Sequence, residues 1–275
     1  HEFVVGDEIR CDYDVIVVGS GFGGSVAALR AAEKGYRVLV VEAGRRFRDE
    51  DFPKTSWDIR NYLWAPWLRC FGIQRISLLR NVMVLSGAGV GGGSLVYANT
   101  LYEPHDDFYA DPQWREITDW RDELAPYYAR ARRMLGVVTN PETTPADVAM
   151  RDVAQEMGVG STFRLTPVGV LFGSQPGVPV PDPFFGGLGP SRTTCTSCGG
   201  CMTGCRVGAK NTLVKNYLAL AEHAGVRVRA LTTVTAIRPL PGAGYAVDIH
   251  PTGPPRRAGR ETLTAAQVVL AAGAL

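Results

Sequence analysis

The feature that most constrains the fold is an apolar run that ends in a glycine-rich turn near the N-terminus. Residues 14–19 form this run, with apolar side chains on both faces, as in a buried parallel strand. Residues 25–34 carry small and apolar side chains at helical spacing, and Gly35 is placed to stop that helix. Residues 37–41 form a second β-branched run. The sequence therefore predicts a right-handed βαβ unit of about thirty residues, within an α/β fold.

The junction between the first strand and the helix is a G-x-G-x-x-G sequence spanning residues 19–24. In such a turn Gly19 permits the sharp bend, Gly21 lets the backbone approach a pyrophosphate, and Gly24 lets helix and strand pack closely. The exposed N–H groups and the helix dipole then favour phosphate. We therefore expect contacts to a dinucleotide from Gly19, Gly21, Phe22, Gly23 and Gly24.

An acidic residue, Glu42, ends the second predicted strand and is followed by Ala43. This is the position from which a carboxylate can bind the ribose hydroxyls of an adenosine. A carboxylate there repels a 2′-phosphate, which disfavours NADP; Arg45 and Arg46 are better explained as surface residues than as counter-charges. Strand, glycines, helix, second strand and acid fall in the order that dinucleotide binding requires. The alternative is a tight turn in an unrelated α/β fold.

A second glycine-rich loop distinguishes between FAD and NAD. Residues 87–93 contain five glycines, flanked by apolar runs that argue against a freely flexible surface loop. A simple NAD dehydrogenase has no need of such a loop, whereas FAD requires backbone to approach its pyrophosphate and its flavin edge without Cβ atoms in the way. Consecutive N–H groups there could also stabilise the negative charge of a reduced flavin. The expected cofactor contacts are Gly87, Gly89, Val90, Gly91, Gly92, Gly93 and Ser94.

These motifs resemble those of the glucose–methanol–choline (GMC) oxidoreductases, in their bacterial cholesterol-oxidase-like branch. The matching stretches are the N-terminal fingerprint with residues 42–44, the loop 87–96, and residues 268–275. The resemblance implies that residues 268–275 form the final strand and turn onto the FAD phosphates, through Ala272 and Gly273. It also implies that Val234 lies near the adenine. In this family an asparagine directly follows the second loop; here Tyr97 stands there, and Asn99 is the candidate for the equivalent role near the flavin.

The resemblance implies a Rossmann-type FAD-binding domain with part of an α+β substrate domain. The FAD-binding domain is expected at residues 12–105, a helical and loop insertion, partly the substrate cap, at 106–209, and a return to the FAD-binding domain at 210–275. Further elements are expected as helices at 114–135 and 211–224, a long ordered loop region with short strands at 140–194, and strands at 226–237, 245–250 and 261–270.

The family's reaction is oxidation of an alcohol. A base takes the hydroxyl proton while hydride moves to the flavin, and a 3β-hydroxysteroid such as cholesterol is the candidate substrate, with O2 or another electron acceptor. In this family the base is a histidine near the C-terminus, partnered by histidine or asparagine. The sequence has no residue in that role, because its histidines are scattered and have no paired acid. We therefore expect an N-terminal fragment, truncated at its C-terminus, that is inactive by itself.

Four of the six cysteines lie within eleven residues, as Cys195-x2-Cys198-x2-Cys201-x3-Cys205. This spacing matches bacterial iron–sulfur ligands, although Arg206 replaces the usual proline; a tetrahedral zinc site, disulfides or free thiols are the alternatives. A chain of this size does not need disulfides, which favours reduced thiols and a cytoplasmic location.

The cysteines keep a second function class open, a flavin and iron–sulfur dehydrogenase or electron-transfer subunit that passes electrons to an acceptor other than O2. An NAD-dependent Rossmann dehydrogenase is a third class, for which the second glycine loop would have no purpose. The net charge of +2 gives no reason to expect nucleic acid, and no apolar run approaches the roughly 18 residues of a transmembrane span.

Overall fold

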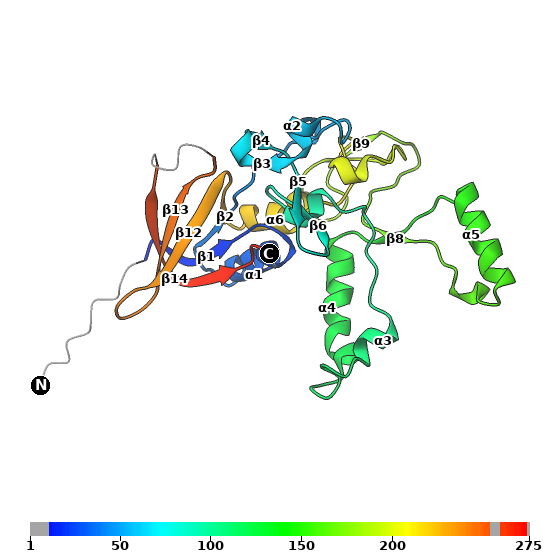
Figure 1. Cartoon of the computed structure of the whole chain (residues 1–275), viewed down its shortest axis with the longest axis horizontal. Helices are drawn as coiled ribbons and strands as arrows, with labels where there is room; N and C mark the ends of the chain where they lie inside the picture. The colour runs from blue at the N-terminus through cyan, green and yellow to red at the C-terminus, as the bar shows by residue number, and fades with distance from the viewer. Residues whose placement is uncertain (1–10, 254–258, 274–275) are drawn as a thin grey trace, which may run out of the picture.

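The computed structural model describes residues 11–253 and 259–273, and its centre is a six-stranded sheet (Figure 1). Four neighbouring strands run parallel, and the last three strands of the chain form an antiparallel meander at one edge. In spatial order the strands are β11 (Arg227–Arg229), β2 (Val38–Val41), β1 (Tyr13–Val18), β14 (Glu261–Leu270), β13 (Tyr245–Pro251) and β12 (Thr232–Pro239).

Strand β1 lies inside the parallel part of the sheet, where apolar side chains on both faces are needed. Ile16 stands opposite Leu39 of β2 and Val268 of β14, and it is fully buried, as are Val17 and Val40. An unbroken β-branched run fits this environment, because a parallel strand is covered on both faces.

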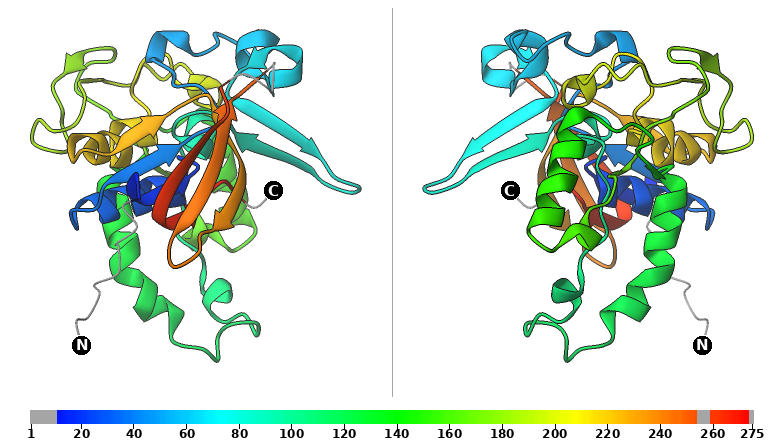
Figure 2. Two further views of the ribbon diagram at one scale, coloured as in Figure 1. Left: turned by 90° about the vertical axis from the view of Figure 1, so that its left-hand side faces the viewer. Right: turned by 90° about the vertical axis from the view of Figure 1, so that its right-hand side faces the viewer.

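Two helices cover one face of the sheet and the meander covers the other. Helices α1 (Phe22–Ala32) and α6 (Tyr217–His223) pack together, with Leu29 and Leu218 in the core beneath them. On the opposite face Ile16 packs with Val247 and Ile249 of the meander. The three antiparallel strands curve, as Figure 2 shows, and they cover the face that a second layer of helices would otherwise cover.

Excursions from this core carry the remaining elements. The hairpin of β5 (Gln74–Leu78) and β6 (Met83–Gly87) projects from the molecule (Figure 2), and its Leu78 is 78% exposed. The other elements are the 3-10 helices η1 (Asp49–Asp51), η2 (Pro66–Leu68), η3 (Gly92–Leu95), η4 (Gly160–Thr162), η5 (Gly200–Thr203) and η6 (Leu213–Lys215), the helices α2 (Ile59–Tyr62), α3 (Asp106–Tyr109), α4 (Trp120–Met134) and α5 (Pro145–Glu156), and the strands β3 (Trp64–Ala65), β4 (Cys70–Phe71), β7 (Val138–Thr139), β8 (Pro167–Val168), β9 (Pro179–Val180) and β10 (Arg192–Thr193).

The predicted βαβ unit and the two final strands are confirmed, and the α/β fold with them. The single strand predicted for residues 226–237 is wrong. The chain turns at Leu231, whose φ is +50°, so that β11 pairs with β2 while β12 pairs with β13. The last two residues of the expected final turn, Ala274 and Leu275, lie outside the described residues. The domain boundaries at 105 and 209 stay predictions.

Three further predictions need correction. The helix expected at 114–135 begins only at Trp120, because Asp119 caps it there by accepting from the backbone N–H groups of residues 121 and 122. The helix expected at 211–224 begins at Tyr217, after a 3-10 turn. The region 140–194 contains helix α5, which the sequence analysis missed although Thr144 and Asp147 form a capping box around Pro145.

No helix in the described part of the chain combines the length and apolar character that crossing a bilayer requires.

Replacing Gly24 by alanine is expected to destabilise the protein by about 1–3 kcal/mol, because the added Cβ would lie 2.0 Å from the carbonyl oxygen of Gly19. Gly23→Ala is the matched control, since its Cβ would meet no atom within 4 Å and alanine favours a helix more than glycine does. Chemical denaturation measures both, and equal midpoints for the two variants would contradict this prediction.

Candidate functional site

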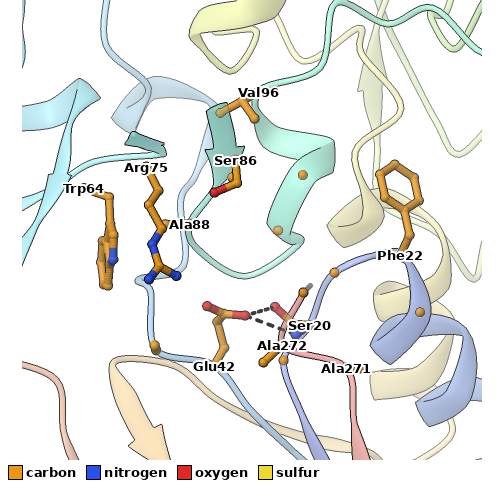
Figure 3. A pocket seen from close by; sticks show the side chains of 18 of the residues that line it. Ser20, Phe22, Glu42, Trp64, Arg75, Ser86, Ala88, Val96, Ala271 and Ala272 are labelled. Carbon is orange, nitrogen blue, oxygen red and sulfur yellow. Dashed lines mark hydrogen bonds between the residues drawn. The ribbon is translucent and has the colours of Figure 1, made fainter. Parts of the chain in front are cut away.

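A groove of about 810 Å³ lies where the parallel strands end (Figure 3). Ligands of open α/β sheets bind at this edge, outside the carboxyl ends of the strands. Gly19 follows β1, Glu42 follows β2, and Ala271 follows β14, so three strands deliver the floor of the groove. The root of the β5–β6 hairpin and the second glycine loop form its other wall.

The two glycine loops that line this groove contact each other. A Cβ on Gly92 would lie 2.7 Å from the Cα of Gly21, and Gly92 has a φ of +50°, which L side chains rarely adopt. A Cβ on Gly87 would lie 2.2 Å from the carbonyl oxygen of Gly92. Glycine is therefore required here by close approach of backbone to backbone, and the two predicted loops form one structure.

A buried carboxylate fastens the first loop. Glu42 accepts hydrogen bonds from the backbone N–H of Ser20 (3.1 Å), from the Ser20 hydroxyl (2.7 Å) and from the backbone N–H of Gly44 (2.9 Å). The Ser20 Oγ in turn accepts from the N–H of Gly91 at 3.0 Å. An ionised carboxylate has about four acceptor positions, so Glu42 can still accept from a ribose hydroxyl.

The start of helix α1 is open to an anion. Gly21 is the N-cap, no side chain caps the helix, and its first turn has no acidic residue. A Cβ on Gly21 or on Gly23 would meet no protein atom within 4 Å. The uncapped N–H groups can donate hydrogen bonds to a pyrophosphate, and the space beside them is free to hold it. The start of α1 therefore fits the pyrophosphate of a dinucleotide.

Most of the predicted cofactor residues line this groove. They are Gly19, Gly21, Phe22, Gly23, Glu42, Ala43, Gly87, Gly92, Gly93, Val234, Ala272 and Gly273.

Six predicted residues stand behind the wall and do not line it: Gly24, Gly89, Val90, Gly91, Ser94 and Asn99. Ser94 donates from its hydroxyl to the carbonyl of Gly91 and accepts from the N–H of Leu213, so it ties the second loop to the core. Asn99, with a φ of +59°, donates from Nδ2 to the sulfur of Cys201. These residues shape the groove from behind.

The excursions bring further residues to the groove that were not predicted from the sequence, chiefly Trp64, Arg75, Tyr97 and Met202. Figure 3 shows Trp64 and Arg75 on the side of Glu42, and Phe22 and Val96 away from it. Burial raises the pKa of Tyr97, and its hydroxyl donates to the carbonyl of Asn211. Only Tyr97 had a local signal, its place directly after the second loop.

The predicted metal site at the cysteines is not supported. Among residues 11–253 and 259–273, no group of three or more His, Cys, Asp or Glu side chains is arranged to hold a metal ion. Cys195, Cys198, Cys201 and Cys205 are free thiols. Three of them have local partners instead, because Cys195, Cys201 and Cys205 accept hydrogen bonds from Ser197, Asn99 and Lys210, respectively.

Comparison with known proteins agrees with this geometry. A family model described as an FAD binding domain matches residues 14–51. The chain is 62% identical over 269 residues to a cholesterol oxidase of Mycobacterium tuberculosis, covering 96% of this chain and 46% of that protein. It is 30% identical to a GMC-type oxidoreductase of the same species, covering 95% and 37%. The crystal structure of pyridoxine 4-oxidase from Mesorbium loti has a TM-score of 0.61 at 20% identity, over 97% of this chain and 50% of that one.

The fold and the family model define the class of the protein, a Rossmann-type α/β protein whose cofactor is FAD. Over almost its whole length the chain is similar in sequence to a cholesterol oxidase and to a GMC-type oxidoreductase. It spans less than half the length of the two Mycobacterium tuberculosis relatives.

Ser20→Ala is expected to cost about 1–3 kcal/mol, because it leaves the buried N–H of Gly91 unpaired and removes one donor from Glu42. Ser25→Ala is the matched control. Ser25 is equally buried, but its hydroxyl only donates to the carbonyl of Phe22 within its own helix turn. Denaturation midpoints measure both changes, and a Ser20→Ala loss no larger than that of Ser25→Ala would contradict the prediction.

Proposed function

We propose that the groove binds FAD in an extended conformation and that the protein is an FAD-dependent oxidoreductase acting on CH–OH groups. The observation that carries this proposal is the contact of Gly92 with Gly21, since it makes one continuous bare-backbone site from two separate loops. An NAD site would use the first loop alone.

The residues of the groove suggest how the cofactor lies. The adenosine ribose would bind Glu42, with Val234 beside the adenine, and the pyrophosphate would lie at the start of α1. The flavin would then occupy the end away from Glu42, near Phe22, Tyr97 and Met202. When bound, FAD supplies the hydride acceptor, and the residues of this chain bind and orient it.

The proposed substrate is a hydrophobic alcohol, with a 3β-hydroxysteroid as the first candidate, because the relative at 62% identity is a cholesterol oxidase. The groove has no histidine among its described lining residues. We infer that the base for the hydroxyl proton is a residue that this sequence does not contain. With the cysteines not arranged as a ligand set, the iron–sulfur dehydrogenase has no observation in its favour.

Gly21→Ala is expected to weaken FAD binding at least about tenfold, a loss of about 1.4 kcal/mol, because its Cβ would occupy the space that the pyrophosphate needs. The apo protein is expected to keep its stability, since that Cβ meets no protein atom within 4 Å. Titration with FAD, followed by flavin fluorescence, measures the affinity. Unchanged FAD affinity in a folded Gly21→Ala variant would contradict the proposed site.

The 275-residue chain loaded with FAD is expected not to reduce its flavin when mixed anaerobically with a 3β-hydroxysteroid, because no histidine that could take the hydroxyl proton is among the described residues that line the groove. Reduction by dithionite is the control that the bound flavin is competent. Bleaching of the flavin absorbance by the sterol would refute the inference about the base, while leaving FAD binding intact.

A further inference from the structure

The charged side chains of the groove are an acid on its floor and a base on its wall. Among the described residues that line it, only Glu42, after β2, and Arg75, in β5, are charged. The proposed function gives Glu42 a role, the binding of the adenosine ribose. It gives Arg75 none, although a charged group in a ligand groove commonly fixes the ligand and sets its specificity.

The backbone that carries Arg75 is fixed to the second glycine loop. In the hairpin Arg75 stands opposite Ser86, directly before that loop. The neighbouring Gln74 is buried, and its side-chain amide donates to the carbonyl oxygen of Ser86 at 3.1 Å and accepts from the Tyr62 hydroxyl at 3.3 Å. The root of the hairpin therefore holds Arg75 at the groove, while the tip of the same hairpin projects from the molecule.

The guanidinium of Arg75 has no partner in the part of the chain that the structure describes, since it makes no hydrogen bond, ion pair or ring contact there. Figure 3 shows it extending from the hairpin wall toward the floor of the groove, between Trp64 and Glu42. An exposed arginine is most often a solvated surface residue. This one differs in its direction, because its N–H donors point into a groove and are free for a ligand.

The proposed ligand needs a positive charge in this groove. The pyrophosphate of FAD is a dianion, and the start of α1 offers it backbone N–H groups but no charged side chain in the first turn. Glu42 accepts from the N–H of Ser20, next to Gly21, so a negative carboxylate lies close to the proposed phosphate position. Like charges repel strongly where a ligand displaces water. Arg75 is the described lining residue that can offset this repulsion.

We propose that Arg75 is a specificity residue for the cofactor, and that its guanidinium binds the pyrophosphate of FAD from the hairpin wall. This inference rests on the proposed FAD site. A guanidinium presents a planar fork of N–H donors that matches a pair of phosphate oxygens, and such charge-assisted hydrogen bonds are about twice as strong as neutral ones. The groove would thereby favour FAD over riboflavin, which lacks the pyrophosphate.

The test is competition of ADP and of adenosine with FAD, followed by flavin fluorescence. Both probes carry the adenosine, and only ADP carries the pyrophosphate. Arg75→Met is expected to weaken the binding of FAD and of ADP about tenfold and to leave that of adenosine within about twofold. Arg75→Lys keeps the charge but loses the fork, and is expected to stay within about threefold of the wild type.

Arg80→Met is the matched control. Arg80 is an exposed arginine of the same hairpin and does not line the groove, so its replacement should leave the affinities for FAD, ADP and adenosine unchanged. Salt gives a second readout, because it screens charges. Raising the salt from about 50 mM to about 500 mM is expected to weaken ADP binding more in the wild type than in Arg75→Met.

The Arg75→Met variant is expected to keep the denaturation midpoint of the wild type, since the guanidinium has no partner in the described residues. An unchanged ADP affinity in this variant overturns the inference. Equal weakening of ADP and adenosine also overturns it, because Arg75 would then contact the nucleoside and not the phosphates. In both cases FAD binding by the wild-type chain leaves the proposed function standing, whereas failure of the wild type to bind FAD overturns the proposed function.

Discussion

The site depends on a contact between two pieces of backbone with no side chain between them. Gly92 lies against Gly21, and the nearby hydrogen bond from Gly91 to Ser20 joins residues 71 positions apart in the sequence. Because neither loop has a Cβ at this contact, the groove can be narrow enough to hold a pyrophosphate with backbone N–H groups alone. Glu42 has two roles here. It accepts the hydrogen bonds that fix Ser20, and it also lines the groove.

The parts of the fold that the sequence predicts well are those whose signals are local. The β1–α1–β2 unit has its strand pattern, turn and helix stop within about thirty residues, which is the scale of such a unit. The strand predicted at 226–237 fails for a different reason: an apolar alternation does not show that the chain changes partner at Leu231, because pairing is decided by tertiary contacts. Helix α5 had a local signal in Thr144 and Asp147, and it was overlooked among the prolines and glycines around it.

The residues of the site also fall into two groups, those that a local sequence pattern predicts and those that only the tertiary structure brings to the groove. Glycines and Glu42 could be predicted, because dinucleotide binding demands those residue types at fixed spacing. Trp64 and Arg75 could not, since an irregular excursion brings them to the groove and no local pattern states where it packs. The cysteine spacing was misleading because the backbone directs the thiols to separate partners, such as Asn99 for Cys201. The burial of Lys210 is equally invisible in the sequence, where a lysine predicts a solvated surface position.

The pairing of β1 with β14 has a consequence for biosynthesis. Tyr13 stands beside Ala265, so strand β1 must wait for the synthesis of strand β14, which comes much later in the sequence, before its second edge is covered. Ala271, Ala272 and Gly273 complete the floor of the groove after that strand. Nascent chains that have not yet exposed these residues would lack a finished binding site, so capture of the cofactor should follow their translation and cannot guide the earliest folding of the N-terminal unit.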